Sequence, residues 1–359
     1  MAELRRLLRS PLYWLLIFAP VTAGLQAAGA SPLAVLIGAS LAIIPLAGLI
    51  GEATEVLAAH TGPRIGGLLN ATLGNAAELI ITIVAIREGL LELVKASITG
   101  SIIGNLLFVL GVSMIWGGVR HGTQAFERRR AQTDSIQLLL AVTALAIPSL
   151  FVQSGQGIDG VSQVEVLSLG VATLMVAIYA LGLIFSLRGG EGPLTRPSAE
   201  PMVHRPGWSV RAALAALVFA TLGVVWLSEV LVQQVEPVVL NLGVSEFFLG
   251  VILVPIVGNI AEHLVAVRVA GRNQMSLSVE IAVGSSLQVA LFVVPALVFL
   301  SLALAHPLTL VFNGFELIAL VGAVVIVNQV ASDGESNWLE GAELLALYLI
   351  LALAFFLLP

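Results

Sequence analysis

The sequence contains no cysteine and only one lysine, Lys95, among its 359 residues. The absence of cysteine excludes disulfide bonds and thiolate sites for soft metals. Charged residues make up 11% of the chain, whereas soluble globular proteins contain about 25%. The net charge is −6, so the chain lacks the basic patch that binds nucleic acid. These deficits exclude an ordinary cytoplasmic enzyme, a disordered protein and a nucleic-acid-binding protein.

Apolar residues, in contrast, make up 58% of the chain, and the mean hydropathy is +1.03. One membrane span needs about 20 apolar residues, so this length accommodates about eleven spans. The sequence therefore predicts an all-α integral membrane protein with almost no soluble domain. We expect eleven transmembrane helices at residues 11–29, 32–59, 65–87, 89–118, 134–152, 162–187, 209–234, 245–270, 275–303, 308–331 and 338–358.

The basic residues orient these spans. In an eleven-span arrangement only Arg87 and Lys95 fall on one side of the membrane. Positive residues mark the cytoplasmic side, so we expect the N-terminus inside and the C-terminus outside. Short loops and the absence of cysteine favour a prokaryotic plasma membrane. The residues on the predicted cytoplasmic side are Arg5, Arg6, Arg9, Arg64, Arg120, Arg128, Arg129, Arg130, Arg188, Arg196, Arg205, Arg211, Arg268 and Arg272.

The chain contains an internal repeat. The segment Leu69–Glu78 reads LNATLGNAAE, and Leu253–Glu262 reads LVPIVGNIAE, so both contain the pattern G-N-x-A-E. The same shift of 184 residues aligns Gly100-Ser101 with Gly284-Ser285. Several matches at one offset predict two related halves. We divide the chain into an extra N-terminal helix (1–31), a first repeat (32–187), a cytoplasmic linker (188–207) and a second repeat (208–359).

Each repeat has five predicted spans. Because five is odd, the two repeats enter the membrane from opposite sides. Inverted repeats are typical of secondary transporters, whose substrate site lies near the membrane midplane between the repeats.

Glu78 and Glu262 are the main candidate site residues. Each lies inside a predicted span, where an ionised carboxylate costs at least about 2.5 kcal/mol. Each also follows an asparagine, Asn75 or Asn259, by three positions, which places the two side chains on one helix face. We expect Gly74 and Gly258 to break their helices and expose backbone carbonyls. Neutral oxygen ligands on adjoining spans are Ser101, Asn105, Ser285 and Gln288; the serines equally suit close helix packing.

Two carboxylates surrounded by amide, hydroxyl and carbonyl oxygens form a hard-ligand site. Calcium takes six to eight oxygen ligands in a flexible geometry, whereas magnesium demands a tighter octahedral one. Zinc and copper normally recruit histidine or cysteine. The sequence therefore predicts Ca²⁺ as a transported substrate bound by Glu78 and Glu262, with no resident cofactor.

Further titratable residues leave alternatives open. His263 either modulates the site or serves helix packing. Glu55 and Glu229 occupy similar positions in the two repeats and could form a second acidic pair or a proton relay. Glu52 and Glu280 suit interfacial charges, and Glu316 is a further candidate.

Several motifs together resemble the calcium/proton exchangers, the CAX branch of the calcium/cation antiporter superfamily. Sodium/calcium exchangers typically carry a Pro-Glu pair where this chain has Ala77-Glu78 and Ala261-Glu262. The motifs that resemble the CAX branch are GLLNATLGNAAELI (67–80), GSIIGNLLFVLG (100–111), PIVGNIAEH (255–263), GSSLQVALFV (284–293), GEATEVLA (51–58) and DGESNWLEG (333–341).

The resemblance implies eleven helices, with helices 2–6 and 7–11 related by inversion. It also implies cation binding by Glu78 and Glu262. Two departures concern regulation: the linker has only Glu191 and Glu200 as acidic residues, and Leu79 stands where the second repeat has His263.

We therefore expect a proton-coupled calcium antiporter in the lipid bilayer, a secondary transporter and not an enzyme. The alternative is a sodium- or potassium-coupled divalent cation exchanger, or a Mn²⁺/H⁺ exchanger. A channel and an intramembrane enzyme fit less well, because the chain has no repeated filter loop and no catalytic motif of a known class. The sequence leaves open whether the protein forms a homo-oligomer.

Overall fold

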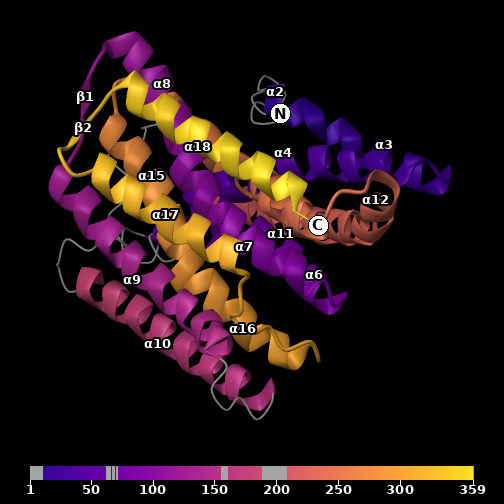
Figure 1. Cartoon of the computed structure of the whole chain (residues 1–359). Coiled ribbons are helices and arrows are strands. Elements are labelled where there is room, and N and C mark those ends of the chain that lie inside the picture. Colours follow the sequence, from indigo (N-terminus) through magenta and orange to yellow (C-terminus); the bar gives the residue numbers. More distant parts are fainter. Residues whose placement is uncertain are drawn as a thin grey trace.

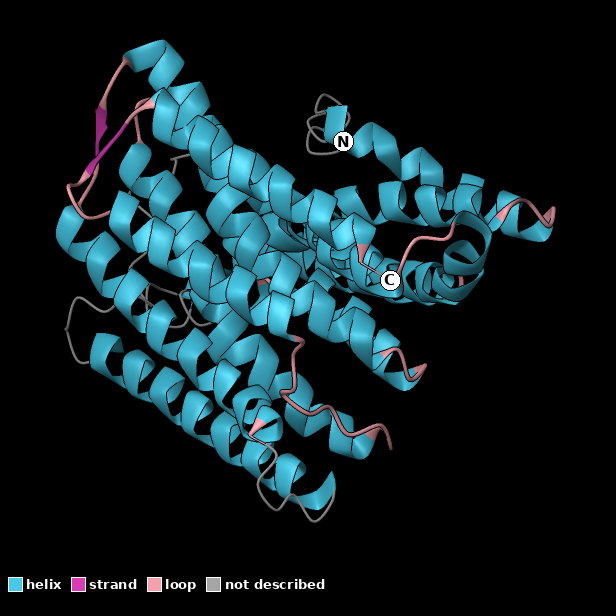
Figure 2. Ribbon diagram, viewed as in Figure 1, coloured by secondary structure: helices cyan, strands magenta, loops and turns pink. Residues whose placement is uncertain are grey.

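The computed structural model describes residues 11–61, 66, 69, 72–154, 161–187 and 208–358. The predicted linker at 188–207 and seven of the arginines used for orientation lie outside these residues. Almost all of the described chain is helical (Figure 2). The prediction of an all-α membrane protein is therefore confirmed, and eight described helices are long and apolar enough to cross a membrane.

The helices follow the predicted spans closely. Shorter segments lie at α2 (Pro11–Trp14), η1 (Leu15–Ile17), α3 (Phe18–Ala27), α6 (Ala76–Arg87), α12 (Val235–Leu242) and α13 (Glu246–Phe248). The longer helices are α4 (Pro32–Thr61), α9 (Arg128–Gln153), α10 (Val161–Leu187), α11 (Val210–Gln233), α14 (Val254–Ala270), α17 (Gly314–Val330) and α18 (Trp338–Leu357). Because α3, α6 and α17 are short, the count of eleven spans stays a prediction.

Two continuous helical rods carry matching irregularities. The first is α7 (Leu91–Ile103), η2 (Gly104–Val109) and α8 (Leu110–His121), and the second is α15 (Met275–Gln288), η4 (Val289–Val293) and α16 (Val294–Ala303). Both η2 and η4 are π-helical turns. A third π-helical turn, η3 (Leu249–Leu253), precedes α14. Such turns are rare in proteins overall, but those that occur are often at functional sites. The shift of 184 residues that relates the two repeats also aligns η2 with η4.

The helices α4 and α11 pack antiparallel. Leu46 lies against Gly223, whereas Val56 and Leu57, ten residues further along α4, cluster with Ala213 at the start of α11. The first helical segment, α2 to α3, runs along α4. Figure 1 shows α2, α3, α4, α11 and α12 on one side of the molecule, beside the bundle that contains α8, α9, α10, α15, α17 and α18.

The tenth predicted span begins later than expected. We predicted a helix from residue 308, but α17 begins at Gly314, and the preceding segment from Pro307 is extended. Its backbone N–H groups at residues 308, 310 and 312 donate to hydroxyls of Ser301, Ser168 and Ser149 at 2.8–3.0 Å. Non-helical backbone inside a membrane protein needs such internal partners, so the serines make this departure from a helix stable.

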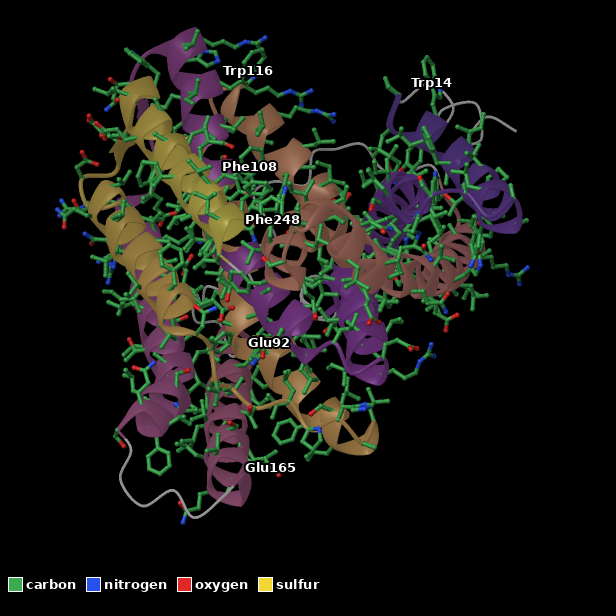
Figure 3. The ribbon with its side chains drawn as sticks, turned by 45° about the vertical axis from the view of Figure 1, so that its right-hand side comes forward. Trp14, Glu92, Phe108, Trp116, Glu165 and Phe248 are labelled. Carbon is green, nitrogen blue, oxygen red and sulfur yellow. The ribbon has the colours of Figure 1, made fainter. Side chains whose placement is uncertain are left out.

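The two ends of the bundle have different contacts. At one end, Arg120 stacks on Trp116 at 4.1 Å, and the strands β1 (Gln124–Ala125) and β2 (Glu335–Ser336) pair antiparallel. At the other end, Lys95 donates to the carbonyl of Val311 at 3.1 Å. Figure 3 labels Trp116 at the first end, with Glu92 and Glu165 toward the second.

Candidate cation site

Glu78 lies in the first turn of α6, directly after a break in the helix. Gly74 and Asn75 form a turn, and regular helix starts at Ala76. The first helical turn presents unpaired N–H groups and the positive end of the helix dipole, which favours a negative side chain there. The expected break at Gly74 is therefore present and places Glu78 at a helix N-terminus inside the molecule, where its side chain is 1% exposed.

Gly258 does not break its helix, in contrast to our expectation. The helix α14 runs unbroken from Val254 to Ala270, and Pro255 sits in its first turn, where a missing N–H costs little. Gly258 instead permits close approach: a Cβ atom there would lie 3.3 Å from the Cβ of Glu78. The missing side chain thus lets α14 cross α6 directly at the carboxylate.

The two carboxylates lie close enough to interact electrostatically across this crossing. Each lies beside a serine at the same repeat position: Ser101 donates a hydrogen bond to Glu78, and Ser285 lies close to Glu262. Asn259 also lies beside Glu78 and donates to the Ser101 hydroxyl at 3.5 Å. Both halves therefore contribute one Ser–Glu pair to a shared site.

A second set of contacts has no counterpart in the other half. Asn75 donates from Nδ2 to Gln288 Oε1 at 2.9 Å. Asn105 donates to the Ser285 hydroxyl at 3.2 Å and accepts from His263 Nε2 at 3.0 Å. At the corresponding repeat positions, residues 289, 104 and 79 are Val, Gly and Leu. The structure thus gathers the polar side chains of the predicted cation site and His263 around the crossing of α6 and α14, with Asn75 and Gln288 as a separate hydrogen-bonded pair.

Several acceptor oxygens in this network lack a donor. Oδ1 of Asn75, Oε2 of Glu78, Oδ1 of Asn259 and Oε2 of Glu262 are all buried without a hydrogen-bond partner. Buried carboxylate and amide oxygens are costly when unpaired. These four oxygens can accept hydrogen bonds but cannot donate them. Oxygens of this kind are the ligands that calcium takes in proteins. Among the described residues, no group of three or more His, Cys, Asp and Glu side chains is placed to hold a metal ion. The candidate site therefore offers only two carboxylates, and its other ligands are neutral oxygens.

The structure does not bring Glu55 and Glu229 together. Both lie near the C-terminal ends of their helices, and α4 and α11 are antiparallel, so the two carboxylates lie toward opposite ends of the pair. Glu229 forms an ion pair with Arg87 at 3.0 Å, and Glu55 is exposed. A shared second acidic site is therefore wrong for this conformation, and a role for either residue in proton relay stays a prediction.

Two further carboxylates named in the sequence analysis lie inside the molecule. Glu316 is fully buried, accepts from the Asn313 backbone and Thr99, and so caps α17. Glu280 pairs with Arg130 inside the molecule and is more than an interfacial charge. Sequence reasoning missed its neighbour Asp134, which is 3% exposed. The signal was available, because Asp134 follows Arg130 by four residues on α9.

Comparison with known proteins identifies a family, close relatives and a similar solved structure. The model of the sodium/calcium exchanger protein family matches residues 31–188 and 212–357. A Ca²⁺/H⁺ antiporter of Aphanothece halophytica is 42% identical over 97% of this chain and 96% of its own length. The Ca²⁺/H⁺ antiporter ChaA of Bacillus subtilis is 45% identical over 88% of this chain and 90% of its own length. The structure of native YfkE superposes with a TM-score of 0.84 at 39% identity, covering 97% of this chain and 100% of that one.

Proposed function

Because this chain belongs to the sodium/calcium exchanger family and is a Ca²⁺/H⁺ antiporter like its relatives, we propose that calcium and protons compete at Glu78 and Glu262. The observation that carries this assignment is the set of buried acceptor oxygens without donors around both carboxylates. A calcium ion would coordinate these oxygens by accepting their lone pairs. In the other occupied state, protons would neutralise the two carboxylates.

This competition accounts for obligatory exchange. Calcium requires both carboxylates ionised, whereas protons bind the same two groups. The empty site is a buried dianion, and its movement through a low-dielectric environment is disfavoured by the cost of unpaired charge. If only the calcium-bound and protonated forms reorient, one substrate leaves before the other enters. We infer that the protein works by alternating access, as a secondary active transporter.

The helix arrangement supports a structural basis for such reorientation. The antiparallel pair α4 and α11 comes from equivalent places in the two repeats and lies beside the remaining bundle (Figure 1). α4 and α11 pack against α6 and α14, which carry the two carboxylates. A movement of the pair relative to these helices would change access to the site without disassembling it.

The alternative functions are exchange coupled to sodium or potassium and exchange of Mn²⁺ for protons. The relatives described above are Ca²⁺/H⁺ antiporters, so neither an alkali-cation exchanger nor a Mn²⁺/H⁺ exchanger is favoured. We further propose a plasma-membrane location with the arginine-rich end in the cytoplasm. This side contains Arg120, Arg128 and Arg130, and the opposite end contains Arg87 and Lys95.

The decisive experiment is calcium-45 uptake into proteoliposomes with an imposed pH gradient. We expect calcium uptake when the lumen is acidic relative to the medium. A protonophore that collapses the pH gradient should abolish this uptake. A sodium or potassium gradient of equal size should drive no uptake at uniform pH. Uptake driven by an alkali-cation gradient alone would contradict proton coupling.

A further inference from the structure

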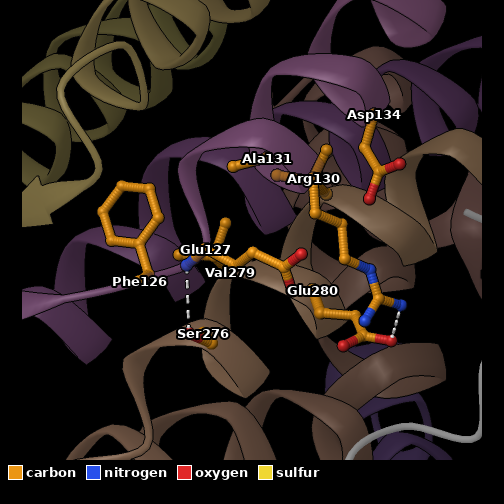
Figure 4. A pocket seen from close by; sticks show the side chains of 9 residues that line it. Phe126, Glu127, Arg130, Ala131, Asp134, Ser276, Val279 and Glu280 are labelled. Carbon is orange, nitrogen blue, oxygen red and sulfur yellow. Dashed lines mark hydrogen bonds and ion pairs between the residues drawn. The ribbon is translucent and has the colours of Figure 1, made fainter.

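A second polar recess lies apart from the transport site, between the beginnings of α9 and α15. Figure 4 shows Glu127, Arg130 and Asp134 from the first element facing Ser276 and Glu280 from the second. Glu280 precedes Ser285 of the transport site by more than one helical turn on α15. The recess is small, with about 20 Å³ of space for the centre of a water-sized molecule, and it is partly open to solvent.

The recess carries an excess of negative charge. Glu127, Asp134 and Glu280 contribute three carboxylates, and Arg130 is the basic residue among its lining residues. Arg130 forms its ion pair with Glu280. The formal charges of these four lining side chains sum to about −2 when all are ionised, and Glu127 and Glu280 also make contacts with other residues. A single divalent cation would balance this charge.

Asp134 gives an independent indication of a ligand. Its side chain is 3% exposed, and its Oδ1 is buried without a hydrogen-bond partner. The carboxylate lines the recess and points toward the region of Arg130 and Glu280 (Figure 4). An unpartnered buried carboxylate oxygen is costly, and a cation in the recess would remove that cost.

The arrangement in this structure is not yet a chelating cage. No three of the described acidic and histidine side chains converge on one metal position, and Glu280 is paired with Arg130. A cation must therefore compete with the guanidinium. Flexible carboxylate geometry of this kind suits calcium better than magnesium, which requires a near-ideal octahedron. The Ser276 hydroxyl, which accepts from the Glu127 backbone N–H at 3.1 Å, provides a further oxygen.

We propose that this recess is a second calcium site, separate from the transported ion, in which Asp134 and Glu280 bind Ca²⁺ when Arg130 moves aside. The ion joins α9 to α15, the helix that carries Ser285 and Gln288. Calcium bound here would thus stabilise the support of the transport site on its arginine-rich side. The assignment does not depend on which ions the transport site exchanges.

The test uses the full-length protein in detergent with its transport carboxylates removed. Equilibrium dialysis with calcium-45 at physiological potassium chloride should find two calcium ions per wild-type chain and one in the double variant Glu78→Gln/Glu262→Gln. Adding Asp134→Asn to the double variant should abolish the remaining binding. Adding Glu335→Gln, which alters an exposed carboxylate on the nearby strand β2, should leave it intact.

The variant Arg130→Gln tests the competition and controls for folding. Removing the guanidinium from the double variant should tighten calcium binding by about tenfold, because the ion no longer displaces a positive charge. Unchanged or weakened binding would overturn the proposal, as would a double variant that binds no calcium or binds magnesium equally well. A double variant that still binds two calcium ions would instead remove the assignment of the transport site.

Discussion

At the scale of single residues, the transport site depends on two carboxylates that have similar neighbours but different exposure. Glu78 is fully enclosed, whereas Glu262 is partly exposed, although one of its oxygens is buried. Each lies beside a serine of its own half, and Ser101 donates to Glu78. The two residues are therefore similar in chemistry but differ in how closely their side chains are packed.

We expect Glu78→Gln and Glu262→Gln each to abolish proton-driven calcium uptake in proteoliposomes. Glutamine keeps the shape and the hydrogen bond from serine but can neither release a proton nor supply a full negative charge. The exposed Glu236→Gln on α12 should transport normally. Both site variants should elute as folded protein, and uptake above one tenth of the wild-type rate in either would contradict the assignment.

Competition also predicts a pH dependence of a particular form. As the pH on the calcium-binding side falls, protons occupy the carboxylates that calcium needs, so the apparent KM for calcium should rise. When two protons compete, mass action allows a rise of up to about a hundredfold per pH unit at the acidic extreme. At alkaline pH the KM should reach a plateau.

The measurement is initial uptake against calcium concentration at several external pH values, with the lumen held constant. The maximal rate should change much less than the KM. A falling maximal rate with a constant KM would indicate that protons act at a remote group, and would contradict competition at Glu78 and Glu262.

The residues of the site could be predicted from the sequence because polar groups stand out in apolar spans. The repeated G-N-x-A-E pattern identified Asn75, Glu78, Asn259 and Glu262. The contacts between halves, such as Asn105 with His263, could not be predicted, because they depend on how α14 packs against η2. Asp134 could have been identified from its position four residues after Arg130, but its unpaired buried oxygen is visible only in the structure.

At the scale of helices, glycine positions govern how closely the two halves approach. A Cβ atom on Gly100 would collide with the backbone carbonyl of Val251 and approach Pro255 Cγ to 2.7 Å. Its repeat equivalent, Gly284, has no atom within 4 Å of the same position. Equal positions in the repeat therefore have unequal packing, which the sequence alone does not reveal.

This contrast provides a matched pair of substitutions. Gly100→Ala should destabilise the protein by at least about 1–3 kcal/mol through overpacking between α7 and η3. Gly284→Ala should be neutral or slightly stabilising, because alanine favours a helix more than glycine does by about 1 kcal/mol. Thermal unfolding of the purified variants in detergent compares them directly. Equal unfolding temperatures would contradict the close approach at Gly100.

Helix existence was predictable from long apolar runs, but helix irregularities were not. The π-helical turns lie inside long apolar runs, whereas the non-helical segment before Gly314 contains Pro307 and ends at Asn313, which caps α17 together with Glu316. The extended segment is stable only because serines from other helices accept its N–H groups. Hydrogen bonds from other helices thus stabilise a non-helical backbone in an apolar stretch. The sequence pattern therefore predicted the start of α17 too early.

At the scale of the whole molecule, the separation of basic residues agrees with the predicted sidedness. Arg120 and Arg130 lie at the end with the β1–β2 ribbon, whereas Arg87 pairs with Glu229 at the opposite end. The bundle therefore has two distinct ends within the described part of the chain. Which of them faces the cytoplasm follows only from the preference of arginine for the inner side.

The absence of native cysteine makes this orientation directly measurable, because one introduced cysteine reacts without background. Glu88 and Glu335 are exposed at opposite ends of the bundle, near Arg87 and on β2 respectively. A membrane-impermeant maleimide added to intact cells should label Glu88→Cys and leave Glu335→Cys unlabelled until the membrane is permeabilised. The opposite pattern would invert the assigned orientation. Labelling of both from outside would contradict the eleven-span arrangement, since an odd number of spans must separate these positions.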